Sequence, residues 1–113
     1  MSDETSQTRA MPFWVWIAAA FAGAFLINSI PHTVMGLTGQ SFPTPFSGGP
    51  GTLSSAVVNI IWGMFNVLVG VSLLRLIRPW KSKLAVRIVI LVCAAAFGLM
   101  LAWAFSSVPV PAV

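Results

Sequence analysis

The stretch TLSSAVVNIIWGMFNVLVGVSLLRLI, Thr52 to Ile77, is apolar except for a regular series of small and polar residues. The series comprises Thr52, Ser55, Asn59, Gly63, Asn66 and Gly70. Steps of three or four residues keep all of them on one stripe of an α-helix, which turns by about 100° per residue. The other faces carry apolar residues such as Val57, Ile61 and Leu68. The stretch therefore predicts one apolar helix with a single polar, small-residue face.

The composition of the whole chain indicates the environment of this helix. Of its 113 residues, 58% are hydrophobic and 7% are charged, whereas soluble domains carry roughly a quarter charged residues. A soluble domain with this composition would expose large apolar patches to water. The sequence therefore predicts an integral membrane protein that forms one compact unit.

Two further apolar runs flank the quoted stretch, so the predicted fold class is all-α with three transmembrane helices. The predicted segments are a polar tail 1–11, a first span 12–30, an uncharged loop 31–52, a second span 53–77, a basic loop 78–83, a third span 84–105 and a tail 106–113. At 1.5 Å per residue, each span is long enough for a bilayer core of about 30 Å. The short basic loop makes the second and third spans antiparallel neighbours.

Local signals agree with these boundaries. Pro12 suits a first helical turn, while Thr52 and Ser82 can cap the second and third helices. The triplet Ala22-Gly23-Ala24 resembles a signal-peptide cleavage site, but the segment before the first span contains two acids and one cation. Signal peptides begin with a positively charged region, so we expect the first span to be retained.

Positive charge is concentrated around one connection. Five of the six cations lie there: Arg75, Arg78, Lys81, Lys83 and Arg87. Residues 36–51 carry no charge. Because positively charged loops stay in the cytoplasm, we expect the amino terminus and the basic loop inside the cell membrane, and the uncharged loop and the carboxyl terminus outside. The same clustering beside apolar runs argues against nucleic acid as a partner.

Asparagine amides in the middle of a span are costly where they face lipid, because an unpaired amide in hydrocarbon loses several kcal/mol. The stripe formed by Asn59, Gly63, Asn66 and Gly70 must therefore face protein or water. One interpretation is close helix packing, with amides bonded across an interface that the glycines allow to approach. The alternative is a hydrated path or ligand site. The other spans also have small-residue sides: Ala18, Ala22 and Ser29 in the first, and Ala94, Gly98 and Ala102 in the third.

A second candidate site lies where the first span meets the uncharged loop. Pro31 removes a backbone donor, and Asn28 and His32 lie one turn apart beside that break. These side chains either pair with the freed backbone groups, or His32 is a proton-responsive or ligand-contacting group. The loop continues with Phe42, Pro43, Pro45 and Phe46. Without charge and with two phenylalanines, the loop is expected to fold back onto the bundle or to dip into the outer interface.

Three segments carry a resemblance to a family. PHTVMGLTG at 31–39, FPTPF at 42–46 and VVNIIWG at 57–63 resemble a group of small bacterial integral membrane proteins that have no assigned activity. The resemblance covers about the first two spans. It implies a bacterial source, and it implies that His32, the FPTPF segment and Asn59 matter together.

The supply of reactive side chains limits the functions available. The only acidic side chains are those of Asp3 and Glu4, and the chain has one cysteine, Cys93, and one histidine, His32. No acid–base pair or metal cluster can be built from these residues, so we expect no enzyme activity, no metal and no cofactor.

Two classes of function remain. The first is a self-associating or accessory structural component of the bilayer, bound to itself or to a larger membrane partner. The second is a homo-oligomeric channel or transporter for a small solute or ion. In that alternative Asn59 and Asn66 line the path, and His32 lies with the FPTPF loop at its outer mouth.

Overall fold

The computed structural model describes residues 10–49 and 51–107, and it is mainly helical apart from the loop of residues 38–55. Its elements are α2 (Phe13–Leu37), α3 (Ala56–Leu76), the 3-10 turn η1 (Arg78–Trp80) and α4 (Leu84–Phe105). All three α-helices are long and apolar enough to cross a membrane. The predicted fold class, an all-α membrane protein with three spanning helices, is confirmed. Most of the two predicted tails lies outside the described residues, as does Pro50.

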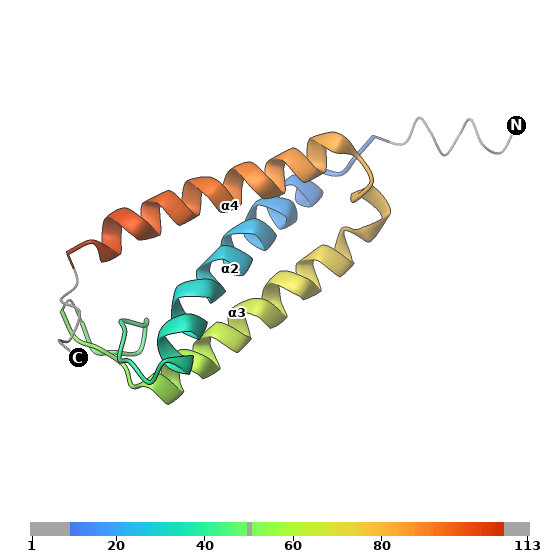
Figure 1. Ribbon diagram of the computed structural model, residues 1–113. Helices are drawn as coiled ribbons and strands as arrows, with labels where there is room; N and C mark the ends of the chain where they lie inside the picture. The colour runs from blue at the N-terminus through green and yellow to red at the C-terminus, as the bar shows by residue number, and fades with distance from the viewer. Residues whose placement is uncertain (1–9, 50, 108–113) are drawn as a thin grey trace, which may run out of the picture.

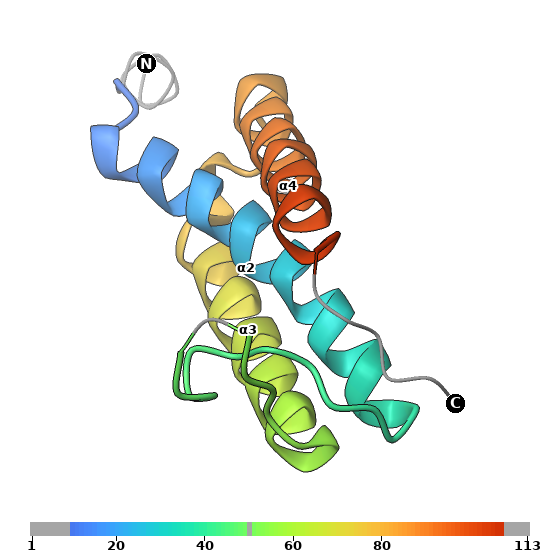
Figure 2. The same cartoon turned by 90° about the vertical axis from the view of Figure 1, so that its left-hand side faces the viewer.

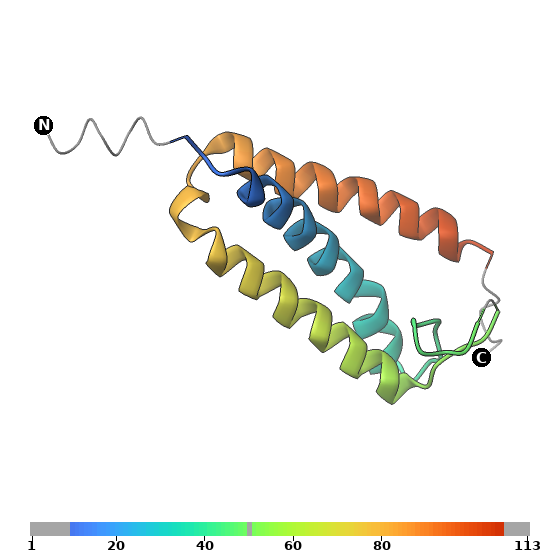
Figure 3. The ribbon, with the colours of Figure 1, turned by 180° about the vertical axis from the view of Figure 1, so that it is seen from behind.

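The helix α2 is the centre of the bundle. Figure 1 shows it between α3 and α4, and the opposite view in Figure 3 shows the same order. The helices α3 and α4 are antiparallel, as the short connection predicts, but they diverge from η1 and each packs along α2 instead of along the other. The expectation that they are antiparallel neighbours is therefore right for their direction and wrong for their packing. The reason is that α2 carries small residues on two sides, which lets both other helices approach it.

The first helix continues beyond Pro31, so its predicted end at residue 30 is wrong. The helix ends instead before Gly39, which has a φ of 74°, and the Gln40 amide donates to the Met35 carbonyl at 2.9 Å. This arrangement is a Schellman C-cap, which favours glycine in the left-handed conformation. A proline removes only one helical hydrogen bond, and the turns after Pro31 are held against α3 by the buried residues His32 and Gly36.

The other helix starts differ from the predicted caps. Ser55, not Thr52, is the N-cap of α3, and its side chain accepts a hydrogen bond from the Val58 amide at 3.3 Å. The residues just before it are extended, because Ser54 pairs with Phe42 in an antiparallel bridge, and this pairing delays the helix. The N-cap of α4 is Lys83, without a side-chain hydrogen bond, so Ser82 does not cap it.

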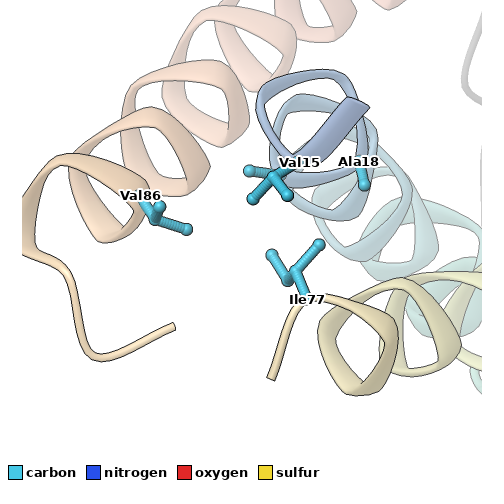
Figure 4. Packing of buried hydrophobic residues seen from close by; sticks show 5 residues of the cluster. Val15, Ala18, Ile77 and Val86 are labelled. Carbon is cyan, nitrogen blue, oxygen red and sulfur yellow. The ribbon is translucent and has the colours of Figure 1, made fainter. Parts of the chain in front are cut away.

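An apolar core closes the end of the bundle near η1. Figure 4 shows Val15 and Ala18 of α2 facing Ile77, at the end of α3, and Val86 of α4. Val86 is the only buried residue of α4 within the described range. This core joins all three helices at one end, and the polar residues of α3 lie farther along, between α2 and α3.

Glycines set the distance between α2 and its neighbours. A Cβ atom at Gly23 would overlap the backbone carbonyl oxygen of Ile90 on α4, and one at Gly63 would overlap the hydroxyl of Thr33 on α2. On α4, a Cβ atom at Gly98 would lie 3.2 Å from the side chain of Ile27, whereas Ala102 is exposed. The predicted small-residue side of α4 is therefore used at its middle and not at Ala102.

Candidate functional site

The best-defined polar cluster joins His32 of α2 to Asn59 of α3. The Nδ1 atom of His32 lies 2.8 Å from Oδ1 of Asn59. The Asn59 amide nitrogen donates to the carbonyl oxygens of Phe42 at 2.9 Å, Ser54 at 3.1 Å and Ser55 at 3.0 Å. His32 is 3% exposed and Asn59 is 0% exposed. One asparagine thus connects both helices and the loop between them.

These contacts determine which ring nitrogen of His32 carries the hydrogen. The Asn59 amide cannot be flipped, because its oxygen would then face three carbonyl oxygens. Oδ1 is an acceptor only, so Nδ1 of His32 must carry the hydrogen and donate it. In the neutral ring, Nε2 is therefore the bare acceptor. His32 is therefore bonded to a side chain of α3. The described residues show no hydrogen bond from it to a carbonyl freed by Pro31, which was one of the two alternatives for this histidine.

Aromatic rings surround this histidine. The ring centroids of Phe42, Phe105 and Trp62 lie 5.5, 6.3 and 6.4 Å from that of His32, all at steep interplanar angles. Phe42 and Phe105 also contact each other, with centroids 4.5 Å apart. Edge-to-face contacts of this kind stabilise aromatic pairs beyond the area that they bury. The cluster brings the loop and the end of α4 together over His32.

The uncharged loop folds back onto the bundle, which is one of the two arrangements expected from its composition. Figure 2 shows it lying across the ends of α2 and α3. The backbones of Phe42 and Ser54 exchange hydrogen bonds of 3.1 and 3.0 Å, and the hydroxyls of Thr44 and Ser54 lie 2.6 Å apart. Phe46 packs edge-on against Trp62, with centroids 5.3 Å apart. The loop is therefore an ordered cap.

A second polar pair, formed by two asparagine amides, lies about two turns farther along α3. The side chain of Asn28 donates to Oδ1 of Asn66 at 2.9 Å, and the Asn66 amide nitrogen donates to the Trp62 carbonyl at 2.7 Å. Asn66 is 1% exposed. Both asparagines of α3 are thus bonded to side chains of α2.

The four residues of the predicted stripe that lie in the middle of α3 are the same four that are buried in the structure. Within that helix the buried positions are Asn59, Gly63, Asn66 and Gly70. Asn28, His32 and Phe42 of the predicted outer site join this interface through the contacts given above. Pro31 instead lines a groove of about 340 Å³ with Phe42 and Phe105. Pro43 is half-buried in the loop, and Pro45 and Phe46 are exposed.

Sequence reasoning missed three members of the cluster: Ser54, Trp62 and Phe105. Trp62 follows Asn59 by three residues, so helical spacing alone could have placed it beside the stripe. Ser54 and Phe105 carry no such signal, because the pairing of the loop and the position of α4 bring them there.

One polar atom of the cluster is unsatisfied. Nε1 of Trp62 is buried and has no hydrogen-bond partner within the described residues. Its ring stacks on Phe65, with centroids 5.4 Å apart and planes 16° apart. Trp62 also borders an apolar groove of about 240 Å³ with Asn28, Asn66 and three phenylalanines, Phe21, Phe25 and Phe97. The cluster is therefore polar inside and apolar at its surface.

The described residues contain no group of three or more histidine, cysteine or acidic side chains close enough to hold a metal ion. What the arrangement offers chemically is hydrogen bonding between helices. No family model, curated protein or solved structure matches the chain. The resemblance to small bacterial membrane proteins stays a prediction.

Proposed function

We propose that this chain is a small multi-pass structural or accessory component of a bacterial cell membrane, which associates with itself or with a larger membrane partner. The observation that carries the proposal is that Asn59, Asn66 and His32 make their hydrogen bonds to buried groups of α2, α3 and the loop between them. A solute path needs polar groups that face water. Side chains with 0–3% exposure favour helix packing over a path.

The outward surface supports the same proposal. The helix α4 packs along one side on α2 and presents large apolar side chains elsewhere: Leu84, Ile88, Leu91, Val92, Leu99 and Trp103. The outer side of α3 is similar, with Val57, Ile61, Met64 and Leu68 exposed. Surfaces of this kind suit lipid or another transmembrane helix.

The test is a flux and assembly assay on the purified protein. In proteoliposomes we expect no release of ions or small polar solutes above that of empty vesicles, together with a defined oligomer in native mass spectrometry or a larger partner that co-purifies. The matched pair is Asn66→Leu and Leu68→Ala, the first buried and the second exposed on the same helix. Flux in the wild type that Asn66→Leu abolishes, with assembly and the Leu68→Ala variant unchanged, would support the channel alternative and overturn the proposal.

We further propose that the amino terminus and the η1 connection lie in the cytoplasm and the loop after α2 lies outside. Thr52 and Ser82 are exposed in the connections at opposite ends of α3, so each suits a single cysteine in a Cys93→Ala background. An impermeant thiol reagent added to intact cells is expected to label Thr52→Cys and to spare Ser82→Cys. The reverse pattern would invert the orientation.

A further inference from the structure

Five cationic side chains gather at the end of the bundle where α3 and α4 meet. They are Arg75, Arg78, Lys81, Lys83 and Arg87, and all of them are exposed. Arg75 lies in the last turn of α3 and Arg87 in the first turn of α4. With a rise of 1.5 Å per residue, both lie within about 5 Å of the helix ends, measured along the helix axes. The five charges therefore form one surface, the cationic hairpin, residues 75–87.

The cationic hairpin has no counter-charge in the part of the chain that the structure describes. The sequence contains only two acidic side chains, Asp3 and Glu4, against six cations. Neither acid falls within residues 10–49 or 51–107. Like charges held this close repel one another, and they create a positive potential that attracts anions from outside the chain.

One of the cations is held in place by the turn itself. Nε of Arg87 donates to the backbone carbonyl of Lys81 at 3.0 Å, which connects the start of α4 to the residue after η1. The terminal nitrogens of the guanidinium can then still donate to an anion, and the planar guanidinium matches the geometry of phosphate oxygens. Arg87 thus presents a guanidinium that the turn holds in place beside the other cations of the hairpin.

Two tryptophans lie at the same end of the molecule. Trp14 and Trp80 contact each other edge to face, with centroids 5.3 Å apart, and Trp80 also packs against the apolar core of Val15, Ile77 and Val86. Tryptophan is enriched at the level of lipid headgroups, because its ring is apolar and its N–H is polar. The tryptophan pair therefore favours headgroup depth for the cationic hairpin.

From the excess of positive charge within the described residues, the arginine held by the turn and the tryptophan pair, we infer that the cationic hairpin is a docking surface for anionic phospholipid headgroups, with their net negative charge as the feature it recognises. Clusters of Lys and Arg immediately beside a transmembrane helix attract anionic lipids. This inference goes beyond the proposed structural role, and it holds whether or not the chain self-associates.

The test measures lipid selectivity by electron paramagnetic resonance in vesicles of phosphatidylcholine. We expect spin-labelled phosphatidylglycerol to associate with the protein about fivefold more strongly than spin-labelled phosphatidylcholine, the effect of one Lys or Arg near an anionic surface. In Arg78→Gln/Lys81→Gln/Arg87→Gln the ratio is expected to fall well below fivefold, because three of the five cations are removed. Arg87→Lys, which keeps the charge, retains most of the preference.

The control is Ser82→Gln, which changes an exposed, uncharged residue of the hairpin and should leave the ratio unchanged. Arg78→Gln and Lys81→Gln are also measured singly, since both side chains are exposed and neither change should disturb folding; each is expected to lower the ratio in part. Equal association of the two lipids with the wild type would overturn the inference, as would an unchanged ratio in both single variants. Loss of the preference on adding millimolar inorganic phosphate at constant ionic strength would overturn it in favour of a soluble phosphate ligand.

Discussion

Replacement of Asn59 by leucine is expected to lower the free energy of unfolding by about 3 kcal/mol. The change removes the acceptor of the His32 Nδ1–H group, which is 3% exposed, and leaving a buried donor unpaired costs about 1–3 kcal/mol. It also removes the two bonds that attach the loop carbonyls of Phe42 and Ser54 to α3. Those carbonyls keep their backbone partners, so the cost falls mainly on the histidine and on the attachment of the loop.

A double-mutant cycle with His32→Leu separates the two contributions. Because the two side chains contact each other, we expect a coupling energy of about 1–3 kcal/mol, measured by SDS titration in mixed micelles and followed by circular dichroism. Hydrogen exchange at the Phe42 and Ser54 amides should accelerate in Asn59→Leu, because the loop is then held only by its own bridge. The exposed change Ser72→Ala is the control. Strict additivity of the two single variants would show that the pair has no energetic coupling.

A methyl group added at Gly23 is expected to be comparably damaging, although it touches no polar side chain. The new Cβ of Gly23→Ala would overlap the Ile90 carbonyl oxygen on α4, with the Ala94 amide nitrogen at 3.1 Å. These are backbone atoms of a neighbouring helix, so the only relief is to move α4 away from α2. Overpacking typically costs about 1–3 kcal/mol, and we expect the upper end of this range in the same SDS titration.

Gly98→Ala is the matched control on α4. Its new Cβ would meet the Ile27 side chain at 3.2 Å, and a flexible side chain can shift by a few tenths of an ångström. We expect a loss below about 1 kcal/mol. If Gly23→Ala proved as mild as Gly98→Ala, the close contact between α2 and α4 would not hold in the membrane.

Only the α3 side of the interface between α2 and α3 could be predicted from the sequence. The spacing of Asn59, Gly63, Asn66 and Gly70 indicates a shielded face because hydrocarbon does not accept unpaired amides. It cannot say what shields that face. The structure supplies Asn28 and His32 from α2, and these become partners only through the register of the two helices.

The carboxyl-terminal end of α2 shows the limit of local rules. A proline inside an apolar run suggests a boundary, yet the helix continues to Leu37. The packing of His32 and Gly36 against α3 outweighs the single hydrogen bond lost at Pro31. Glycine at position 39, which reaches a φ of 74°, marks the true end.

The sequence by itself determined that the chain is a membrane protein with three helices. It also determined that one face of the second helix in the chain, α3, is covered. Both follow from the cost of placing polar groups in lipid, which depends on residue type and helical spacing alone. Only the tertiary structure decided that α2 is the central helix, that Asn59 joins it to the loop, and that Phe105 and Trp62 enclose His32. Those features depend on contacts between residues far apart in the chain, and in lipid many apolar faces pack almost equally well.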